Sequence, residues 1–243
     1  AMAVLIPNPQ LRLLNALRAS TKPIMTFLGL PSFRTAQVVA QTGLDLDCRY
    51  RSFGGLTSDS YQNDPWRFNQ ESFGCWGTWD YRSAGQYCRR SQGGCLCFEI
   101  PPQGCRGQGS AFPAIAHGVD IATYLKTANE TLITCIQIES KTGVDNVDAI
   151  CAVPGVDMIF IGPNDLALSI LGYVPAKGTE PEFVQAIEKI VAAARKHGKW
   201  VGRLSNNGSS CKGDLKVFDT VAMGYDIRAI QNWYSAELQV ARS

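Results

Sequence analysis

The sequence predicts an α/β fold, a TIM (β/α)8 barrel formed by one domain over residues 1–243, with a disrupted sector around residues 46–99. From residue 112 onward, helical periods alternate with short apolar runs, which is typical of βα units around a parallel sheet. One run, residues 156–161, is apolar at nearly every position, as in a strand covered on both faces. The length of 243 residues and the hydrophobic content of 45% are typical of a single barrel domain.

The N-terminal elements are regular as far as Gly43. Residues 24–30 form a strand-like apolar run, and residues 33–42 have the spacing of an amphipathic helix that ends at this glycine. Between residues 46 and 99 neither period is sustained, and Gly, Ser, Arg, Cys and Trp are abundant. Because a disordered linker is poor in Trp and Cys, disorder does not explain this segment.

The C-terminal elements follow in βα order. A helix is predicted at residues 120–130 with Asp120 as its cap, followed by a strand at 132–138 and a helix at 144–153. After the buried strand, the pattern Thr-x-x-Glu at residues 179–182 predicts a capping box for a helix that ends at Gly198. The remaining elements are strands at 200–204 and 220–223 and a terminal helix at 232–242.

Composition excludes several classes of partner. A net charge of +2 and a pI of about 8.1, with Lys and Arg evenly spread, do not favour a nucleic-acid or membrane partner. Polar residues interrupt every apolar run near the N-terminus, so we expect neither a secretory segment nor a spanning helix, and we expect a cytoplasmic protein. Five of the nine cysteines lie between residues 75 and 105, but none has the CxxC spacing of a zinc module.

Four segments carry a family resemblance: AFPAIAHGVDIATYLKTANE, CIQIES, VPGVDMIFIGPNDLALSILGY and PEFVQAIEKIVAAARKHGK. Together they resemble the HpcH/HpaI aldolases, over residues 101–243 and, more loosely, 11–45. The resemblance implies a (β/α)8 barrel, a divalent metal cation such as Mg, Mn or Co, and reversible aldol cleavage that releases pyruvate or a related 2-oxo acid. It also suggests a homo-hexamer.

Two carboxylates are the candidate metal ligands. The strand period of two places Gln137 and Glu139 on one face, with Glu139 at the carboxyl end of its strand, where barrel active sites form. Asp165 follows the next strand on the same rim, and oxygen ligands suit a hard divalent cation. The resemblance implies that Glu139 and Asp165 bind the metal. Alternatively, Asp165 caps a helix that begins at Leu166, and Glu139 is a solvated strand-end acid.

The resemblance also implies that Gln137, Gly162 and Pro163 bind the substrate. Gly162 and Pro163 would bring backbone close to the 2-oxo acid, whose carboxylate would meet N–H groups at the start of the following helix. The metal would bind the carbonyl and carboxylate oxygens of the pyruvyl portion and stabilise the negative charge that develops on bond cleavage. The alternative for Gly162 and Pro163 is an ordinary strand-to-helix turn.

The family's catalytic base is missing from this chain. The family places a His in a D-x-E-H motif after its second strand, whereas this chain reads Asp47-Cys48-Arg49-Tyr50, so Tyr50 stands at the position of the histidine. Of the other histidines, His197 ends a helix, where a positive charge is stabilising, and His117 lies in a Gly-rich loop. We assign neither as the base, and no catalytic residue is proposed.

We hypothesise that residues 46–99 are the product of an out-of-frame translation. Shifting degenerate codons for residues 72–81 by one base permits ALDAGAHGII, and residues 46–52 permit WIVDIDH, which restores a D-x-acid-H motif. The shifted frame still lacks most of one helix, which favours a gene-model or splicing error. We expect a poorly defined sector around residues 49–97 and regular βα units after it, because core packing tolerates little foreign sequence.

The predicted function is that of a divalent-metal-dependent class II aldolase that cleaves a 4-hydroxy-2-oxo acid to pyruvate and an aldehyde. The first alternative is a citryl-CoA or malyl-CoA type lyase of the same superfamily, although no CoA-facing residues are evident. The second is an inactive, barrel-derived scaffold whose Cys- and Trp-rich segment binds a partner. Turnover discriminates between these functions better than metal binding does.

Overall fold

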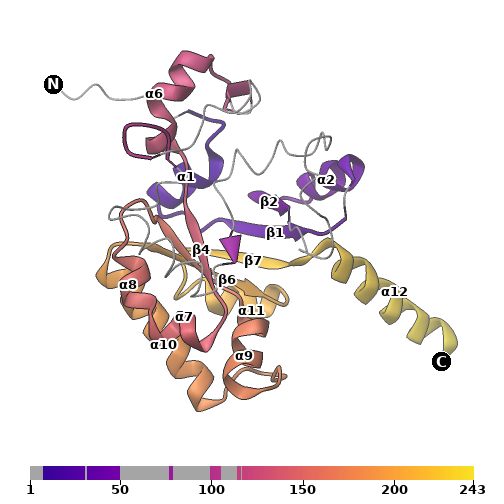
Figure 1. Ribbon diagram of the computed structural model, residues 1–243. Coiled ribbons are helices and arrows are strands. Elements are labelled where there is room, and N and C mark those ends of the chain that lie inside the picture. The colour runs from indigo at the N-terminus through magenta and orange to yellow at the C-terminus, as the bar shows by residue number, and fades with distance from the viewer. Residues whose placement is uncertain (1–7, 31, 50–76, 79–98, 105–113, 116) are drawn as a thin grey trace, which may run out of the picture.

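The computed structural model describes residues 8–30, 32–49, 77–78, 99–104, 114–115 and 117–243. The described strands form one parallel sheet in the order β2-β1-β7-β6-β5-β4-β3, with β2 and β3 at its two ends. They are β1 (Ile24–Leu28), β2 (Leu46–Arg49), β3 (Gly77–Thr78), β4 (Cys135–Ile138), β5 (Met158–Ile161), β6 (Trp200–Ser205) and β7 (Thr220–Tyr225). The predicted parallel α/β architecture is therefore confirmed (Figure 1).

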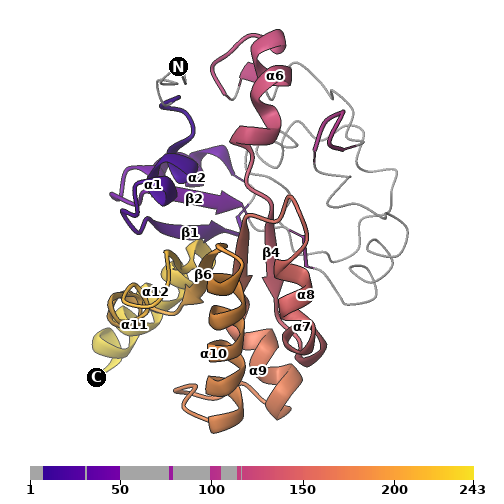
Figure 2. The same ribbon diagram turned by 90° about the vertical axis from the view of Figure 1, so that its left-hand side faces the viewer.

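Helices alternate with the strands along most of the described chain. They are α1 (Arg12–Arg18), α2 (Phe33–Ala40), α6 (Ile121–Thr131), α7 (Lys141–Asp145), α8 (Val147–Cys151), α9 (Pro163–Leu171), α10 (Pro181–Lys196), α11 (Gly208–Asp214) and α12 (Asp226–Arg242). Figure 2 shows α10 running lengthwise beside the strands, with α8 and α9 next to it. Helix α12 extends away from the rest of the molecule (Figure 1).

The sheet separates two apolar cores, because successive side chains of a strand point to opposite faces. We call the core between the sheet and helices α8–α10 the outer core; its members include Ile138, Val147, Ile161, Ile190 and Val201. The core on the opposite face is the inner core, and it includes Leu17, Met25, Cys135, Phe160 and Leu204. Helix α1 packs into the inner core near the strand starts, so this end is filled with apolar side chains.

The predicted helix at residues 144–153 is wrong in its bounds, because the structure has two short helices there. Helix α7 begins at Lys141 and α8 ends at Cys151, with Asn146 between them at φ −104° and ψ 7°. The Asn146 amide donates to the Thr142 carbonyl, which gives the backbone a side-chain partner at the break. Gly143 within α7 weakens the helical signal in the sequence, so the early start was missed.

The predicted capping box at Thr179 is also wrong. Glu180 is the N-cap of α10, without a side-chain capping bond, and Pro181 occupies the first turn. A proline holds the preceding residue extended, as in Glu180 with its φ of −63° and ψ of 129°, so the helix begins one residue later than the box requires. By contrast, Asp120 caps α6 by accepting from the backbone N–H of Thr123, as predicted.

Other element bounds shift by a few residues. The terminal helix begins at Asp226 rather than at residue 232, α9 begins at Pro163, and α1 and α11 were not assigned as helices from the sequence. Within the segment 46–99, residues 50–76 and 79–98 lie outside the described residues, so the out-of-frame hypothesis concerns a part that the structure does not describe. Strand β2 nevertheless begins this segment and pairs with β1, although four residues are too few to show a period.

Among the described residues, no helix combines the length and apolar character needed to cross a membrane. The predicted cytoplasmic location stays a prediction.

Candidate functional site

The candidate site lies where β4 and β5 end. Gln137 on β4 and Glu139, the residue after its end, point to the same face, as predicted: the Gln137 amide Nε2 donates to Glu139 Oε2 at 2.6 Å. Cys135, two residues before Gln137, belongs to the inner core, so this face is the inner one. The two polar side chains therefore follow an apolar core at the carboxyl end of the sheet.

Glu139 lies in an environment that favours its protonated form. Partial burial raises the pKa of its carboxyl group, the Gln137 hydrogen bond opposes this shift, and the negative charge of Asp165 raises the pKa further. Repulsion between the two acids is relieved either by a proton or by a cation. A divalent cation between them would therefore replace an unfavourable interaction with two favourable ones.

Asp165 lies in the first turn of α9 and is exposed to solvent. The helix begins at Pro163, its N-cap is Gly162, and no side-chain capping bond is present. The alternative in which Asp165 caps a helix beginning at Leu166 is therefore wrong. The reason is that Pro163, with its fixed φ and missing N–H, is itself well suited to the first position of a helix.

Gly162 leaves the space in which Glu139 and Gln137 meet. A Cβ atom at this position would lie 2.7 Å from Gln137 Nε2 and 3.2 Å from Glu139 Oε2. Its φ of −87° and ψ of 89° do not require glycine, so close approach is the reason for this residue. Pro163 follows at the rim and orients the helix that carries Asp165.

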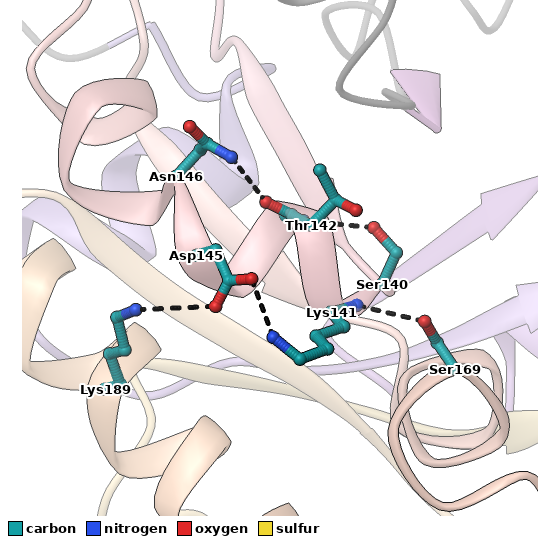
Figure 3. Close-up of polar contacts among 8 residues, drawn as sticks. Ser140, Lys141, Thr142, Asp145, Asn146, Ser169 and Lys189 are labelled. Carbon is teal, nitrogen blue, oxygen red and sulfur yellow. Dashed lines mark hydrogen bonds and ion pairs between the residues drawn. The ribbon is translucent and has the colours of Figure 1, made fainter.

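A polar network behind the rim holds β4 and α9 together (Figure 3). Ser140, directly after Glu139, caps α7 by accepting from the Gly143 N–H at 3.1 Å. The neighbouring Lys141 N–H donates at 3.0 Å to the hydroxyl of Ser169 on α9. The elements that carry Glu139 and Asp165 are thus tied to each other on the side away from the inner core.

An ion-pair cluster extends this network over the helix layer. Lys141 pairs with Asp145 at 2.8 Å, and Lys189 on α10 lies 3.9 Å from the same carboxylate (Figure 3). All three side chains are exposed, so water and salt screen these ion pairs and each contributes little to stability. The cluster therefore orients α7 more than it stabilises the fold.

The donor set of the site fits a hard divalent cation. Glu139 and Asp165 supply carboxylate oxygens, and Gln137 orients one of these carboxylates. Hard cations complete such a set with water or substrate oxygens. Within the described residues, no group of three or more His, Cys, Asp or Glu side chains is arranged as a metal site.

The two histidines lie away from this rim. His117 is buried, packs edge-on against Tyr124 at 5.2 Å between ring centroids, and accepts from Asn8 through its backbone carbonyl. His197 follows α10, and its Nε2 lies 3.1 Å from an Asp148 carboxylate oxygen. These contacts of the two histidines are with residues other than Glu139, and Tyr50 lies outside the described residues.

Polar groups at the ends of two other strands were not predicted from sequence motifs. Asp226 follows β7 and accepts from the backbone N–H groups of Gly29 and Leu30, while Arg203 and Ser205 near the end of β6 contact Asp214. Arg203 and Ser205 lie at the end of the strand predicted at residues 200–204, and Asp226 follows the strand predicted at residues 220–223. The rule that barrel sites form at the carboxyl ends of strands, applied to every strand, would have found these residues.

Comparisons with known proteins agree with this architecture. The model of the family "HpcH/HpaI aldolase/citrate lyase" matches residues 95–232, which begin after most of the segment 46–99. A 5-keto-4-deoxy-D-glucarate aldolase of Klebsiella pneumoniae is 40% identical over 128 residues, which are 52% of this chain and 49% of that protein. The chain thus spans about half the length of the curated relatives that it matches.

Solved structures extend the likeness over nearly the whole chain. An HpcH/HpaI aldolase from Desulfitobacterium hafniense has a TM-score of 0.75 and 20% identity, covering 95% of this chain and 96% of that one. An HpcH/HpaI aldolase/citrate lyase family protein from Burkholderia cenocepacia has a TM-score of 0.71 and 25% identity, covering 98% and 100%. These likenesses confirm the barrel-type α/β fold.

Proposed function

The chain belongs to the HpcH/HpaI aldolase/citrate lyase family, and from this premise we propose that its site is that of a divalent-metal-dependent class II aldolase. The substrate would be a 4-hydroxy-2-oxo acid, cleaved to pyruvate and an aldehyde. The observation that carries the proposal is the placement of Glu139 and Asp165 just after the adjacent strands β4 and β5, where burial, and then the charge of Asp165, raise the pKa of Glu139. Such a pair is suited to hold Mg, Mn or Co.

Each described residue has a role in this proposal. Glu139 and Asp165 would hold the cation, which when bound would polarise the carbonyl of the 2-oxo acid. Gln137 would orient Glu139 through their hydrogen bond and face the substrate, and Gly162 would admit it close to the backbone. The first N–H groups of α9, which lack intrahelical acceptors, would bind the substrate carboxylate.

The name of the curated relatives supports this substrate class. Numbered from its other end, 5-keto-4-deoxy-D-glucarate has a 2-oxo group, a deoxygenated third carbon and a 4-hydroxyl group. This is the pattern that an aldol cleavage divides into pyruvate and an aldehyde. Among the three functions considered, the name favours the aldolase over a CoA-dependent lyase.

The proposed consequence of Tyr50 in place of the family histidine is that this polypeptide binds metal but turns over poorly. The departing hydroxyl needs a base within hydrogen-bonding reach, and both histidines of the chain contact other groups. A version with residues 46–99 in the shifted frame would regain the acid and histidine. Sequencing the transcript across this region tests the frame hypothesis directly.

The decisive experiment measures Mn binding and pyruvate release from a 4-hydroxy-2-oxo acid, with the chain as given and with the frame-shifted version. We expect metal binding by both and turnover by the shifted version only. Glu139→Gln should weaken Mn binding at least tenfold, because it removes a charged ligand, whereas the exposed Glu188→Gln on α10 should leave it unchanged. Metal binding that survives Glu139→Gln, or turnover by neither version, would overturn the aldolase proposal.

We also propose that the chain assembles with copies of itself, up to the hexamer suggested by the family. Helix α12 buries only Asp226 and exposes an apolar set that includes Ile227, Ile230, Trp233, Tyr234 and Leu238. Trp233 is 60% exposed, and such a face is favourable only when a partner covers it. Light scattering on the same preparations gives the oligomeric state, and a monomer would contradict this proposal.

A further inference from the structure

A polar cavity lies on the other side of the sheet from Glu139. It has a volume of about 310 Å³ and lies between α9, α11, the end of β6 and the loop at residues 174–178. Arg203 and Ser205 line it from β6; Val201, in the same alternation, belongs to the outer core. Glu139 and Gly162 face the inner side, so the two sites lie on opposite faces of the sheet.

Arg203 lines this cavity, and part of its guanidinium group is not hydrogen-bonded to any described residue. Its side chain is 20% exposed, pairs with Asp214 at 3.3 Å through Nη1, and lies 5.4 Å from the centroid of the Phe218 ring. The Asp214 carboxylate also accepts a short hydrogen bond from the Ser205 hydroxyl. Within the described chain, the Arg203 Nη2 group has no hydrogen-bond partner, although a guanidinium has five N–H donors.

The charges around the cavity do not balance. Lys177 and Arg203 supply two positive charges and Asp214 supplies one negative charge. Lys177 is exposed and makes no ion pair with any described residue. Burial also lowers the pKa of Arg203, so this cation is incompletely solvated. One further anion would neutralise the site and supply acceptors to both cations.

The remaining lining indicates what kind of anion fits. Asn206 lines the cavity beside Asn207 and Ser210, whose side chains form the capping box of α11, while Ala167 and Phe183 form an apolar side. Such a lining suits a compact ligand that carries hydroxyl groups beside its charge. The volume is at the lower end of the range for small-molecule sites.

We propose that this cavity binds a small hydroxylated anion, a carboxylate or a phosphate, as a ligand separate from the one held at Glu139 and Asp165. Pro163 and Asn164 line the cavity, and Asp165 is the next residue of the same helical turn. A ligand bound there contacts the turn that positions a candidate metal ligand. The site is thus placed to modulate metal binding from behind the rim.

Calorimetric titration of the full chain with inorganic phosphate and with glycerate tests the proposal without requiring turnover. Lys177→Gln should weaken binding about fivefold and Lys177→Glu more, because they remove or reverse an unpaired cation at the cavity. The matched controls are Lys212→Gln and Lys212→Glu, which change an exposed lysine of α11 that does not line the cavity. They should leave the affinity within about twofold, since the cavity contacts are retained.

A second titration distinguishes this ligand from the 2-oxo acid. With Mn and saturating pyruvate present, phosphate should still bind with a similar stoichiometry. Competition with pyruvate would overturn the separate site, as would equal effects of the Lys177 and Lys212 variants or the absence of saturable binding. Since the assay follows binding alone, failure of the aldolase proposal would leave its result interpretable.

Discussion

Glu139 and Asp226 occupy equivalent positions in their βα units, because each directly follows a parallel strand. Asp226 is 6% exposed and accepts from the backbone N–H groups of Gly29 at 2.8 Å, Leu30 at 3.0 Å and Ile227 at 2.7 Å. Glu139 is half-buried and, among the described residues, accepts a hydrogen bond from Gln137 alone, while the negative charge of Asp165 repels that of Glu139.

The difference between these two acids shows that the position directly after a parallel strand can hold either a structural or a ligand-binding carboxylate. The backbone N–H groups around Asp226 satisfy its charge within the fold, so the residue joins the loop after β1 to the start of α12. The partners of Glu139 leave its charge incompletely compensated, so a ligand can supply what is missing. The neighbours of each acid, rather than its place after a strand, therefore decide whether it is structural or ligand-binding.

The largest effect on stability should come from Asp226→Ala. The substitution leaves the N–H groups of Gly29 and Leu30 without their acceptor, which should lower the free energy of unfolding by about 2–4 kcal/mol. Urea denaturation measures this change. The exposed Glu237 on the same helix is the control, and Glu237→Ala should change stability by less than about 0.5 kcal/mol. Equal stabilities of the two variants would show that Asp226 is not a structural link.

An intermediate effect on stability is expected for Gly162→Ala, which places a methyl group against the side chains of Gln137 and Glu139. The added methyl group would meet Gln137 Nε2 at 2.7 Å, so the side chains must shift and stability should fall by about 1–3 kcal/mol. Mn binding should weaken as well, because Glu139 is displaced. Gly213→Ala in α11, where a Cβ meets nothing within 4 Å, is the control and should stabilise the protein by about 0.5–1 kcal/mol. Unchanged Mn binding in Gly162→Ala would exclude a role for this glycine in the site.

The smallest effect is the pH dependence of Mn binding. Because the pKa of Glu139 is raised, its proton persists to a higher pH and competes with the cation. Affinity should therefore increase with pH, by at most about tenfold per unit below this pKa for one released proton, and level off above it. Without metal, the contribution of Glu139 to stability changes in the opposite sense and is lost as pH rises through the raised pKa.

Titrations with Mn at several pH values, paired with thermal unfolding of the metal-free chain, measure both trends. In Glu139→Gln, the contribution of Glu139 to the pH dependence of Mn affinity and of thermal stability should disappear. In Glu188→Gln, both pH dependences should stay unchanged. A Mn affinity that does not change with pH, from the ordinary carboxyl pKa of about 4 up to neutral pH, would show that Glu139 is not a ligand.

Local sequence patterns predicted much of the architecture and the shared face of Gln137 and Glu139 in the candidate site. The apolar run before Gly162 predicted a buried strand, and the alternation through Gln137 placed Glu139 on its face, because strand periodicity is a short-range property. The segment between β2 and α6 offered no comparable pattern, and most of it lies outside the described residues.

Other features depend on contacts between residues far apart in the chain. Two of the backbone N–H groups that Asp226 accepts from, those of Gly29 and Leu30, are nearly two hundred positions away, with a separation of 197 residues to Gly29, and no local pattern identifies them. The repulsion between Glu139 and Asp165, and the cavity that joins Lys177 to Arg203, likewise arise where separate βα units meet. Side-chain periodicity specifies which face of a strand a residue occupies, whereas burial and charge depend on which neighbours the folded chain brings to that face.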